Sequence, residues 1–555
     1  MSMKKSLFAA LAFAVMSAGA AYAGPVPEGT KMDEHIYFNF SLGSEPSTLD
    51  ISRRSDAYSS YIQQDIYEGL VRLMMVDGKP AIAPREAASW DVSEDGLTWT
   101  FHLRDDIKWE DGEPVTAEQY VYGLRRTADP KTASPNAFFL EPLANYEEIS
   151  KGEKGVEELG VSAPDSKTLV MKLTLPDPLF LYKINTTVYY PQREDKIKEW
   201  GDKAGTEAKY TISNSGFKVA DWVHNNKIEL VKNENFYDAK NVYAEKITYR
   251  IIADAAATLN SFKAGEIDSY GVTKKEELEE LRKMPGMVYV TAPSNQVNFG
   301  FFNCNDKVFK NAKIRKAFAL AIDLDLMNEM VYGTMRTPAN GWVLPQESVN
   351  GKNYREQAGD MYALMKKELE DKGMTPRDLL IEGMKEEGLG DDPSKLDVSY
   401  SLGNTDAWMR NCGEFIQSMY ADVLGVNLKL NYMEWGVFND KLNRGDYQIG
   451  LMAWGSYYPD PYELLSLFDS KQDMIKTRWK NEKFDTLITA AKNNMDEAKR
   501  AQELMDAEKV LMVEEGVVFP TAFSVSHAIM PDFVKNSMAD WHNEGDLYIY
   551  TDGRK

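Results

Sequence analysis

Residues 396–432 read LDVSYSLGNTDAWMRNCGEFIQSMYADVLGVNLKLNY, and they predict a complete strand–helix–strand unit. Residues 396–402 and 426–432 are short stretches in which apolar side chains alternate with polar ones, a pattern typical of strands. Between them, residues 406–424 carry apolar side chains at helical spacing. Two strands that flank a helix in this way indicate an α/β fold rather than a helical bundle or an all-β sandwich.

The same alternation of strands and helices extends over most of the chain, whose 555 residues suffice for two or three domains. Further strands are expected at 36–43, 90–103 (a hairpin), 168–175, 217–231 (a second hairpin), 247–252, 288–302 and 517–525. Further helices are expected at 57–70, 115–127 with Thr116 as N-cap, 255–264, 314–330, 361–388 with breaks at Gly373 and Pro376, and 497–515.

The first residues predict an export signal. Lys4 and Lys5 precede an apolar stretch at 7–15, which is too short to span a bilayer. The residues Ala21-Tyr22-Ala23 fit the small-x-small rule for cleavage, so we expect residues 1–23 to be removed. No cysteine follows the cut to accept a lipid. We therefore expect a freely soluble mature protein that starts at Gly24.

Composition excludes some partners and leaves open whether the two cysteines form a disulfide. The net charge of −22 repels nucleic acid phosphates and anionic lipids, so we expect no nucleic acid partner. The loss of Lys4 and Lys5 with the leader makes this charge more negative. The only cysteines, Cys304 and Cys412, lie far apart in sequence, and their spacing does not decide whether they pair.

The search for a reactive centre finds no catalytic or metal-binding pattern. None of the five histidines lies at helical ligand spacing from another or near a cysteine, and no phosphate loop, G-x-S-x-G elbow or dinucleotide fingerprint is present. The acidic pair before Pro393 and the residues Pro459-Asp460-Pro461 are read as turns and N-caps. We therefore predict a binding protein without catalytic residues, metal or cofactor.

A better candidate for a site is the aromatic turn at 451–468, LMAWGSYYPDPYELLSLF. It follows a short apolar strand and precedes a helix, a position at which aromatic side chains often line concave sites. Each aromatic residue taken alone is more often part of a core. Tyr457 and Tyr458 are adjacent, however, and neighbours on an extended chain point to opposite faces, so one core cannot easily hold both.

Nine segments in the same order resemble a known family, the bacterial extracellular solute-binding proteins of family 5, which serve ABC importers of peptides. The segments are SEPSTLD (44–50), IYEGLVRL (66–73), residues 97–135 (LTWTFHLRDD through TASP), SNSGFKVADW (213–222), ELVKNENFYDA (229–239), residues 302–323 (FNCNDKVF through LAID), LGVNLKLNYMEW (424–435), NRGDYQI (443–449) and the aromatic turn itself.

This resemblance implies a periplasmic-binding-protein-like clamshell of type II, in the large peptide-binding cluster, with two lobes and an extra domain. Lobe I would comprise residues 24–67, 193–296 and 525–555, the extra domain residues 68–192, and lobe II residues 297–524. Two hinge segments are expected near 294–298 and near Ser524. The implied protein is a periplasmic monomer that closes around an oligopeptide and delivers it to an inner-membrane ABC permease complex.

The resemblance also implies where the ligand binds. Its backbone would pair with Ser55-Asp56-Ala57 and with Ala453-Trp454-Gly455, an addition of a strand that ignores side-chain identity. Trp435 aligns with an aromatic pocket wall, and Met409, Leu451 and Tyr457 occupy positions that hold charged peptide ends in relatives.

The charged anchors of that pattern are absent here. Tyr457 stands where an aspartate is expected to bind the peptide amine. Leu451 replaces a basic residue and Met409 replaces a histidine. Ser55 stands where the first loop of relatives carries an acidic residue. Asp56 or Asp460 remains as a substitute anchor. The alternatives are a peptide with blocked ends, a non-peptide ligand such as a glycan, opine or metal chelate, or a secreted enzyme or scaffold built on the same clamshell.

Overall fold

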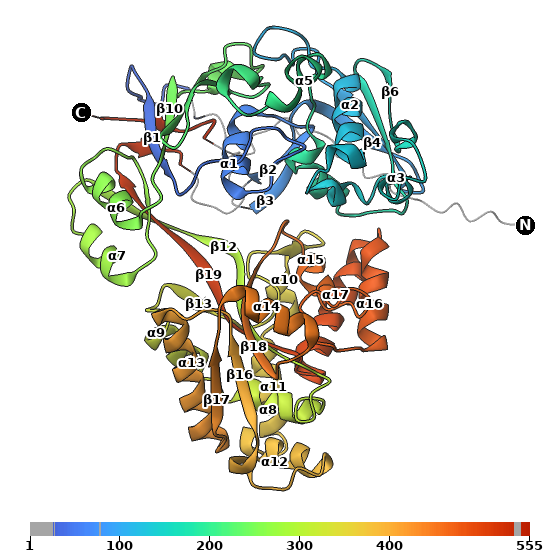
Figure 1. The fold of residues 1–555 in the computed structure, drawn as a ribbon, viewed down its shortest axis with the longest axis vertical. Coiled ribbons are helices and arrows are strands. Elements are labelled where there is room, and N and C mark those ends of the chain that lie inside the picture. The colour runs from blue at the N-terminus through green and yellow to red at the C-terminus, as the bar shows by residue number, and fades with distance from the viewer. Residues whose placement is uncertain (1–25, 27, 77–78, 538–545, 555) are drawn as a thin grey trace, which may run out of the picture.

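The protein is described by a computed structural model covering residue 26 and residues 28–76, 79–537 and 546–554. The expected leader and its cleavage site lie outside the described residues. Within the described ranges, no helix combines the length and the apolar character needed to cross a bilayer. Figure 1 shows two bodies, one above the other, joined by two long strands.

The upper body is built on two four-stranded sheets, with strand orders β1-β10-β9-β8 and β4-β5-β7-β6. A single buried cluster includes residues of both sheets, so the range predicted as the extra domain shares its core with lobe I. The elements are β1 (Tyr37–Leu42), α1 (Ala57–Ile66), β2 (Val71–Val76), β3 (Lys79–Pro84), β4 (Ala87–Val92), β5 (Thr98–Leu103), α2 (Ala117–Ala128), β6 (Val161–Asp165), β7 (Thr168–Lys172), α4 (Phe180–Ile184), β8 (Phe217–Val223), β9 (Lys227–Lys232) and β10 (Lys246–Ile251).

The lower body holds a sheet with the strand order β11-β19-β12-β18-β16-β17, covered by helices. Its strands are β11 (Tyr270–Gly271), β12 (Met287–Phe302), β13 (Arg336–Pro338), β16 (Val398–Leu402), β17 (Leu428–Tyr432), β18 (Ile449–Gly455) and β19 (Val518–Pro531). Its helices include α8 (Ala312–Leu320), α9 (Leu324–Met330), α11 (Met361–Glu370), α12 (Pro376–Glu386), α13 (Ala407–Met419), α14 (Trp435–Arg444), α15 (Pro461–Ser466), α16 (Glu482–Asn493) and α17 (Glu497–Lys509).

The strand–helix–strand unit of residues 396–432 is confirmed. β16 and β17 pair in parallel, with Val398 opposite Leu428 and Leu402 opposite Tyr432, and α13 connects them. α13 begins where the Asp406 side chain accepts a hydrogen bond of 2.7 Å from the Met409 backbone N–H, a standard N-cap. The helix ends five residues earlier than predicted because residues 420–424 form a π-helical turn.

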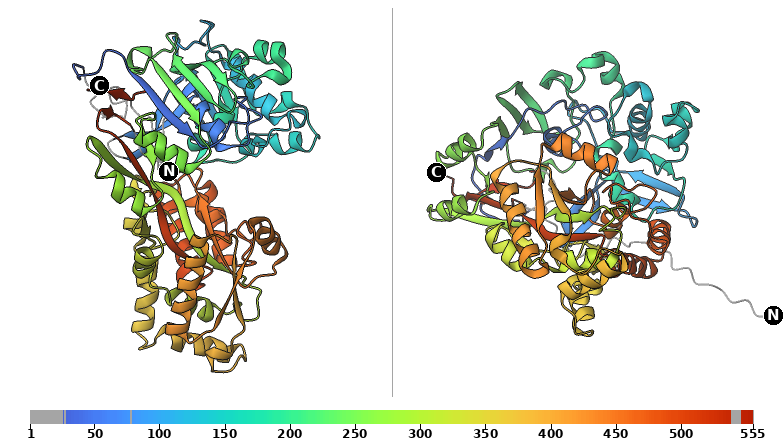
Figure 2. Two further views of the ribbon diagram at one scale, coloured as in Figure 1. Left: turned by 60° about the vertical axis from the view of Figure 1, so that its left-hand side comes forward. Right: turned by 60° about the horizontal axis from the view of Figure 1, so that its bottom comes forward.

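The bodies are joined by β12 and β19, which run side by side from one to the other (Figures 1 and 2). Their register shifts between Pro293 and Val297, an irregularity at which a paired ribbon bends. β19 continues to Pro531, six residues beyond the predicted strand. The cause is long-range pairing, because residues 525–531 of β19 lie opposite residues 287–293 of β12.

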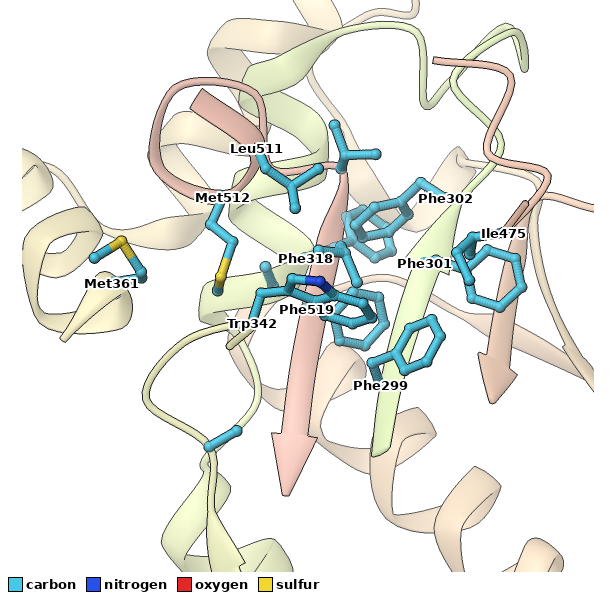
Figure 3. Close-up of a cluster of buried hydrophobic side chains, with 14 of the residues drawn as sticks. Phe299, Phe301, Phe302, Phe318, Trp342, Met361, Ile475, Leu511, Met512 and Phe519 are labelled. Carbon is cyan, nitrogen blue, oxygen red and sulfur yellow. The ribbon is translucent and has the colours of Figure 1, made fainter. Parts of the chain in front are cut away.

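The core of the lower body, which we call lobe II from here on, is dense in aromatic residues. Figure 3 shows it around Phe299, Phe301, Phe302, Trp342 and Phe519. Gly300 lies between these phenylalanines on β12, and a Cβ there would come within 1.9 Å of the Phe519 ring. A smaller buried cluster joins α6 (Ala255–Lys263) and α7 (Lys275–Leu281) to β12 and β19.

Two further predictions differ from the structure. The helix expected at 314–330 is two helices, because the Asp323 side chain accepts from the Leu326 N–H at 3.0 Å and starts α9. The helix expected at 57–70 ends at Ile66, where the backbone of Tyr67 becomes extended. The sequence left open whether Cys304 and Cys412 pair. In the structure both are free thiols, and burial raises their pKa values to about 11 and about 12.

Candidate functional site

Two backbone segments that the resemblance assigned to the ligand lie at the ends of regular elements. Ser55, Asp56 and Ala57 form the start of α1, where Asp56 is the N-cap and Ser55 and Ala57 are exposed. Ala453, Trp454 and Gly455 form the end of β18 in lobe II, next to α14 and α15 at the end of the lobe that faces lobe I (Figure 1). The structure gives the positions of both segments, whereas their role in binding a ligand stays a prediction.

The end of β18 has one open edge. β12 pairs with β18 over its full length, from Phe302 opposite Ile449 to Gln296 opposite Gly455. On the other side, β16 pairs only as far as Leu451. Residues 452–455 therefore lack a neighbouring strand on that side within the part of the chain that the structure describes. Such an edge presents backbone N–H and C=O groups that an extended ligand can pair with.

The aromatic side chains predicted for the site are exposed to different degrees. Trp454 is half-buried, whereas Trp435 at the start of α14 is 55% exposed and Tyr457 is 63% exposed. The Tyr457 ring lies edge-on to Phe139 of the extra domain, with 6.0 Å between the ring centroids. Tyr457 thus lies between the two bodies rather than inside one core, which fits a ligand wall better than a packing role.

Two other predicted site residues, Leu451 and Met409, are buried or half-buried. The side chain of Leu451 is buried in the core of lobe II, because it points inward at the position where β18 pairs with Leu402 of β16. The side chain of Leu451 therefore lies in the core, and its contact with a ligand stays a prediction. Met409 is half-buried and packs against the same core, although it lies in the first turn of α13 near the exposed Trp408.

Exposed aromatic residues that the sequence analysis did not single out lie on other elements. Tyr58 and Tyr61 are three residues apart on α1, share one helix face and are both exposed, immediately after Ala57. Trp408 in the first turn of α13 lies 6.2 Å from the ring of Tyr332, measured between centroids. The helical spacing of the two tyrosines from Asp56 was the available signal, but spacing does not reveal which helix face is left uncovered.

Asp56 is occupied by its own loop. Its carboxylate accepts hydrogen bonds from the Ser59 N–H at 2.7 Å, the Ser59 hydroxyl at 2.7 Å and the Ser47 N–H at 3.1 Å, and also from the Ser47 hydroxyl. Partial burial opposes ionisation, but these bonds outweigh it and lower the pKa of Asp56. A carboxylate that holds this loop together offers little to a ligand amine.

Asp460 is likewise occupied. It is 3% exposed, caps α15 through the Tyr462 N–H at 2.8 Å, and forms a two-pronged ion pair with Arg500 at 2.6 and 2.9 Å. The substitute anchors named from the sequence are thus both engaged inside the protein. A buried charge that loses its partner costs several kcal/mol, so neither acid turns toward a ligand easily.

Glu463 is the remaining acid near the turn. Burial raises its pKa to about 7, while neighbouring donors, the Ser456 hydroxyl first and the Trp454 indole second, offset only part of that effect. Among the described residues, no group of three or more histidine, cysteine, aspartate or glutamate side chains is arranged to hold a metal ion.

The upper body also touches the lower body away from β12 and β19. Leu179, just before α4, is buried within the lobe II core, and Tyr182 packs partly against it. Glu141 of the extra domain lies 3.6 Å from Lys492 on α16. The two bodies therefore meet at β12 and β19 and again beneath α4.

Two bodies joined by paired strands, with an open strand edge between them, define a two-lobed binding protein. The family comparison agrees: the model of bacterial extracellular solute-binding proteins, family 5 middle region, matches residues 81–476, and the chain belongs to this family. The predicted α/β clamshell fold is confirmed by its solved neighbours.

Curated relatives cover nearly the whole chain. The dipeptide-binding protein DppE of Bacillus subtilis is 31% identical over 89% of this chain and 87% of its own length. The periplasmic oligopeptide-binding protein OppA of Escherichia coli is 30% identical over 96% and 95%, respectively. The probable deoxycholate-binding periplasmic protein YgiS of Escherichia coli is 27% identical over 97% and 96%.

Solved structures of other binding proteins match nearly the whole chain. The periplasmic murein tripeptide binding protein MppA in its unliganded open form matches with a TM-score of 0.79 and 26% identity, over 95% of this chain and 99% of that one. Listeria monocytogenes OppA bound to peptide matches with 0.69 and 26%, over 94% and 100%. Both matches share the two-lobed fold with this chain.

Proposed function

We propose that this protein is the extracytoplasmic solute-binding subunit of an ABC importer, which captures oligopeptides between its lobes and delivers them to an inner-membrane permease. The observation that carries the proposal is the open edge of β18 at residues 452–455. Backbone pairing at such an edge accepts many sequences, as an oligopeptide carrier requires. Relatives named for dipeptide and oligopeptide binding support the same class of ligand.

In this proposal Trp435, Trp454 and Tyr457 line the ligand site, with Ser55-Asp56-Ala57 contributing backbone from the other body. The carboxylate that the family pattern expects for the peptide's amino end is absent, because a phenol, Tyr457, occupies its position. We propose further that the mature protein acts as a soluble monomer in the periplasm.

Calorimetry with one peptide in two forms tests the proposal. A free-amine peptide and its N-acetylated twin should bind with affinities within about threefold of each other, since no buried charge pair is lost on acetylation. If neither form of a varied peptide set binds, the peptide-carrier function is wrong. If only the free amine binds, an acid of the site holds it and the proposed role of Tyr457 is wrong.

A second candidate is import of a non-peptide ligand. The exposed aromatic side chains and the engaged state of Asp56 and Asp460 favour an apolar or end-blocked ligand, and the family includes a relative named for deoxycholate binding. Mass spectrometry of small molecules released from the purified protein separates the two. A bile-acid-like, glycan or opine mass in place of peptides would favour the second candidate.

A further inference from the structure

One half-buried arginine of lobe II pairs with no acid among the described residues. Each of the lobe's other arginines that is buried or half-buried forms an ion pair with a carboxylate: Arg315, Arg355, Arg478 and Arg500. Arg336 on β13 has no described carboxylate within ion-pair distance, and its Nη1 is buried without a hydrogen-bond partner. Folded proteins pair nearly all such groups, so this guanidinium points to a partner that the chain itself does not supply.

Two aromatic rings flank this arginine. The Cζ atom of Arg336 lies 4.5 Å from the centre of the Tyr332 ring and 5.2 Å from that of the Trp408 ring. An aromatic face attracts a guanidinium, but it does not replace the in-plane hydrogen bonds that the five N–H groups form. The rings therefore position the cation and leave its N–H donors for another partner. Trp408 is 36% exposed, so solvent reaches the site beside this ring.

Strand pairing places Arg336 level with the open edge of β18. Arg336 lies opposite Ser524 of β19. The Ser524 hydroxyl donates to Oε1 of Gln296 at 3.0 Å, and Gln296 on β12 lies opposite Gly455 at the end of β18. Residues directly opposite one another in paired antiparallel strands share a face of the sheet. These four residues therefore form one row across a single face, which we call the polar row.

The polar row is partly exposed along its whole length. Its four members are all half-buried, and Gly455 has no side chain to cover the sheet. Ala453 lies two residues before Gly455 on the same face of β18 and is exposed. Neighbouring strands lie about 4.8 Å apart, so about 14 Å separate the backbones of Arg336 and Gly455. The arginine side chain extends over part of this span, and the end of a short peptide covers the rest.

A second hydrogen-bond donor lies in the same row. The Ser524 hydroxyl accepts from Nδ2 of Asn298 at 3.0 Å, which leaves its own proton for Oε1 of Gln296. The side-chain oxygen of Gln296 is thus occupied, whereas its NH2 group makes no hydrogen bond with a described residue. The row therefore offers an unpaired cation and an amide donor, a combination that suits an anion with two oxygens.

We propose that Arg336 binds a carboxylate of the ligand, so that the carrier prefers ligands that bring a carboxylate to the polar row. The proposal rests on the peptide-carrier function given above. A guanidinium presents its N–H donors in a fixed fork that matches the two oxygens of a carboxylate. In a peptide this group is either the C-terminus or the side chain of an aspartate or glutamate, and both sources have the same chemistry.

The surroundings of Arg336 favour a carboxylate over a neutral group. A carbonyl or hydroxyl of the ligand would accept from one donor and leave the charge of the half-buried guanidinium uncompensated. A carboxylate accepts from two donors and supplies the opposite charge. Hydrogen bonds between charged groups are about twice as strong as those between neutral ones. The gain from the negative charge should therefore appear directly in the affinity.

The experiment uses the full mature protein and N-acetylated alanine tetrapeptides, so that no ammonium group takes part. One pair of peptides compares a free C-terminal carboxylate with a C-terminal amide. A second set keeps the amide and carries either glutamate or glutamine at one of the four positions. By calorimetry at pH 7 we expect a carboxylate peptide to bind about 10- to 100-fold tighter than its neutral twin. The set in which this preference appears identifies the source of the carboxylate.

Variants assign the preference to the arginine. Arg336→Gln removes the charge and should bring the ratio of the two affinities to about one, while the neutral twin keeps its affinity and so shows that the variant is folded. Arg336→Lys keeps a charge but loses the fork, so it should retain only part of the ratio. Arg377→Gln is the matched control, because it removes an exposed arginine on α12 at the far end of lobe II (Figure 1). It should leave the ratio unchanged.

Equal binding of the carboxylate and neutral twins in both sets would overturn the role of Arg336 while leaving the peptide-carrier function intact. A carboxylate preference that survives Arg336→Gln would overturn it as well, since another cation would then hold the anion. If no peptide of either set binds, the proposed function fails and the role of Arg336 fails with it.

Discussion

In the proposed function, the treatment of the ligand's amino end depends on the residue at position 457. The family pattern expects an aspartate here, and the structure shows that its two candidate substitutes serve other partners. Asp56 holds its own loop through Ser47 and Ser59, and Asp460 is paired with Arg500. The phenol of Tyr457 offers hydrogen bonds without charge, so the site differs from an aspartate-anchored relative mainly in electrostatics.

This difference can be reversed by substitution. Tyr457→Asp should raise the affinity for a free-amine peptide about tenfold relative to its N-acetylated twin, because the new carboxylate can form a charge-assisted hydrogen bond. The comparison is made by calorimetry at pH 7 with both peptides on both proteins.

Tyr457→Asn is the matched control, since it also removes the ring and its contact with Phe139 but adds no charge. It should leave the ratio of the two affinities near that of the unmodified protein. An unchanged ratio in Tyr457→Asp would mean that the peptide's amino end lies elsewhere.

At the scale of elements, local pattern predicted most of the strands and helices, whereas distant partners decided the exceptions. The unit β16–α13–β17 follows from alternation and helical spacing alone. The break between α8 and α9 depends on an N-cap aspartate inside a continuous helical pattern, and the length of β19 depends on β12. The engagement of Asp460 involves a residue 40 positions away, which no local motif reveals.

A buried cluster of two carboxyls and a phenol connects the C-terminal segment to lobe I. The Tyr249 hydroxyl lies 2.6 Å from Asp65 at the end of α1 and 2.7 Å from Asp546. The Asp546 N–H also donates to Asp65 at 2.8 Å. One phenol proton serves only one carboxylate, so a carboxyl proton must complete the arrangement. Burial raises the pKa of both acids, opposed at Asp65 by Tyr249 and Arg72.

This cluster makes stability fall with rising pH. The unfolded chain loses its carboxyl protons near pH 4, whereas the folded chain keeps one here to higher pH, so the folded state binds more protons between these limits. The contribution is therefore full below about pH 4 and is lost as pH rises through the raised folded pKa. Between pH 5 and 8 we expect Asp546→Asn to remove about 2 kcal/mol of the decline in unfolding free energy.

Chemical denaturation at a series of pH values measures this decline. Asp105→Asn removes an exposed acid of the same body and should retain the slope of the unmodified protein. Identical slopes for Asp546→Asn and the unmodified protein would show that no extra proton is held in this cluster.

At the scale of the whole molecule, described residues of the two bodies touch one another away from the paired strands as well. The strands β12 and β19 connect them on one side, and Leu179 with Tyr182 rests on lobe II on the other. A rotation that keeps both contacts needs dihedral changes only in a few strand residues, such as those around the register shift at 293–297.

Ligand should therefore close the molecule. We expect the radius of gyration from small-angle scattering to fall when a saturating peptide is added, because the lobes approach each other without unfolding. Trp454→Ala is the control: it removes a ring from the proposed ligand edge, weakens binding, and should show no change at the same peptide concentration. An unmodified protein whose radius stays constant while calorimetry reports saturation would bind its ligand without closure, and the paired strands would then act as a rigid link.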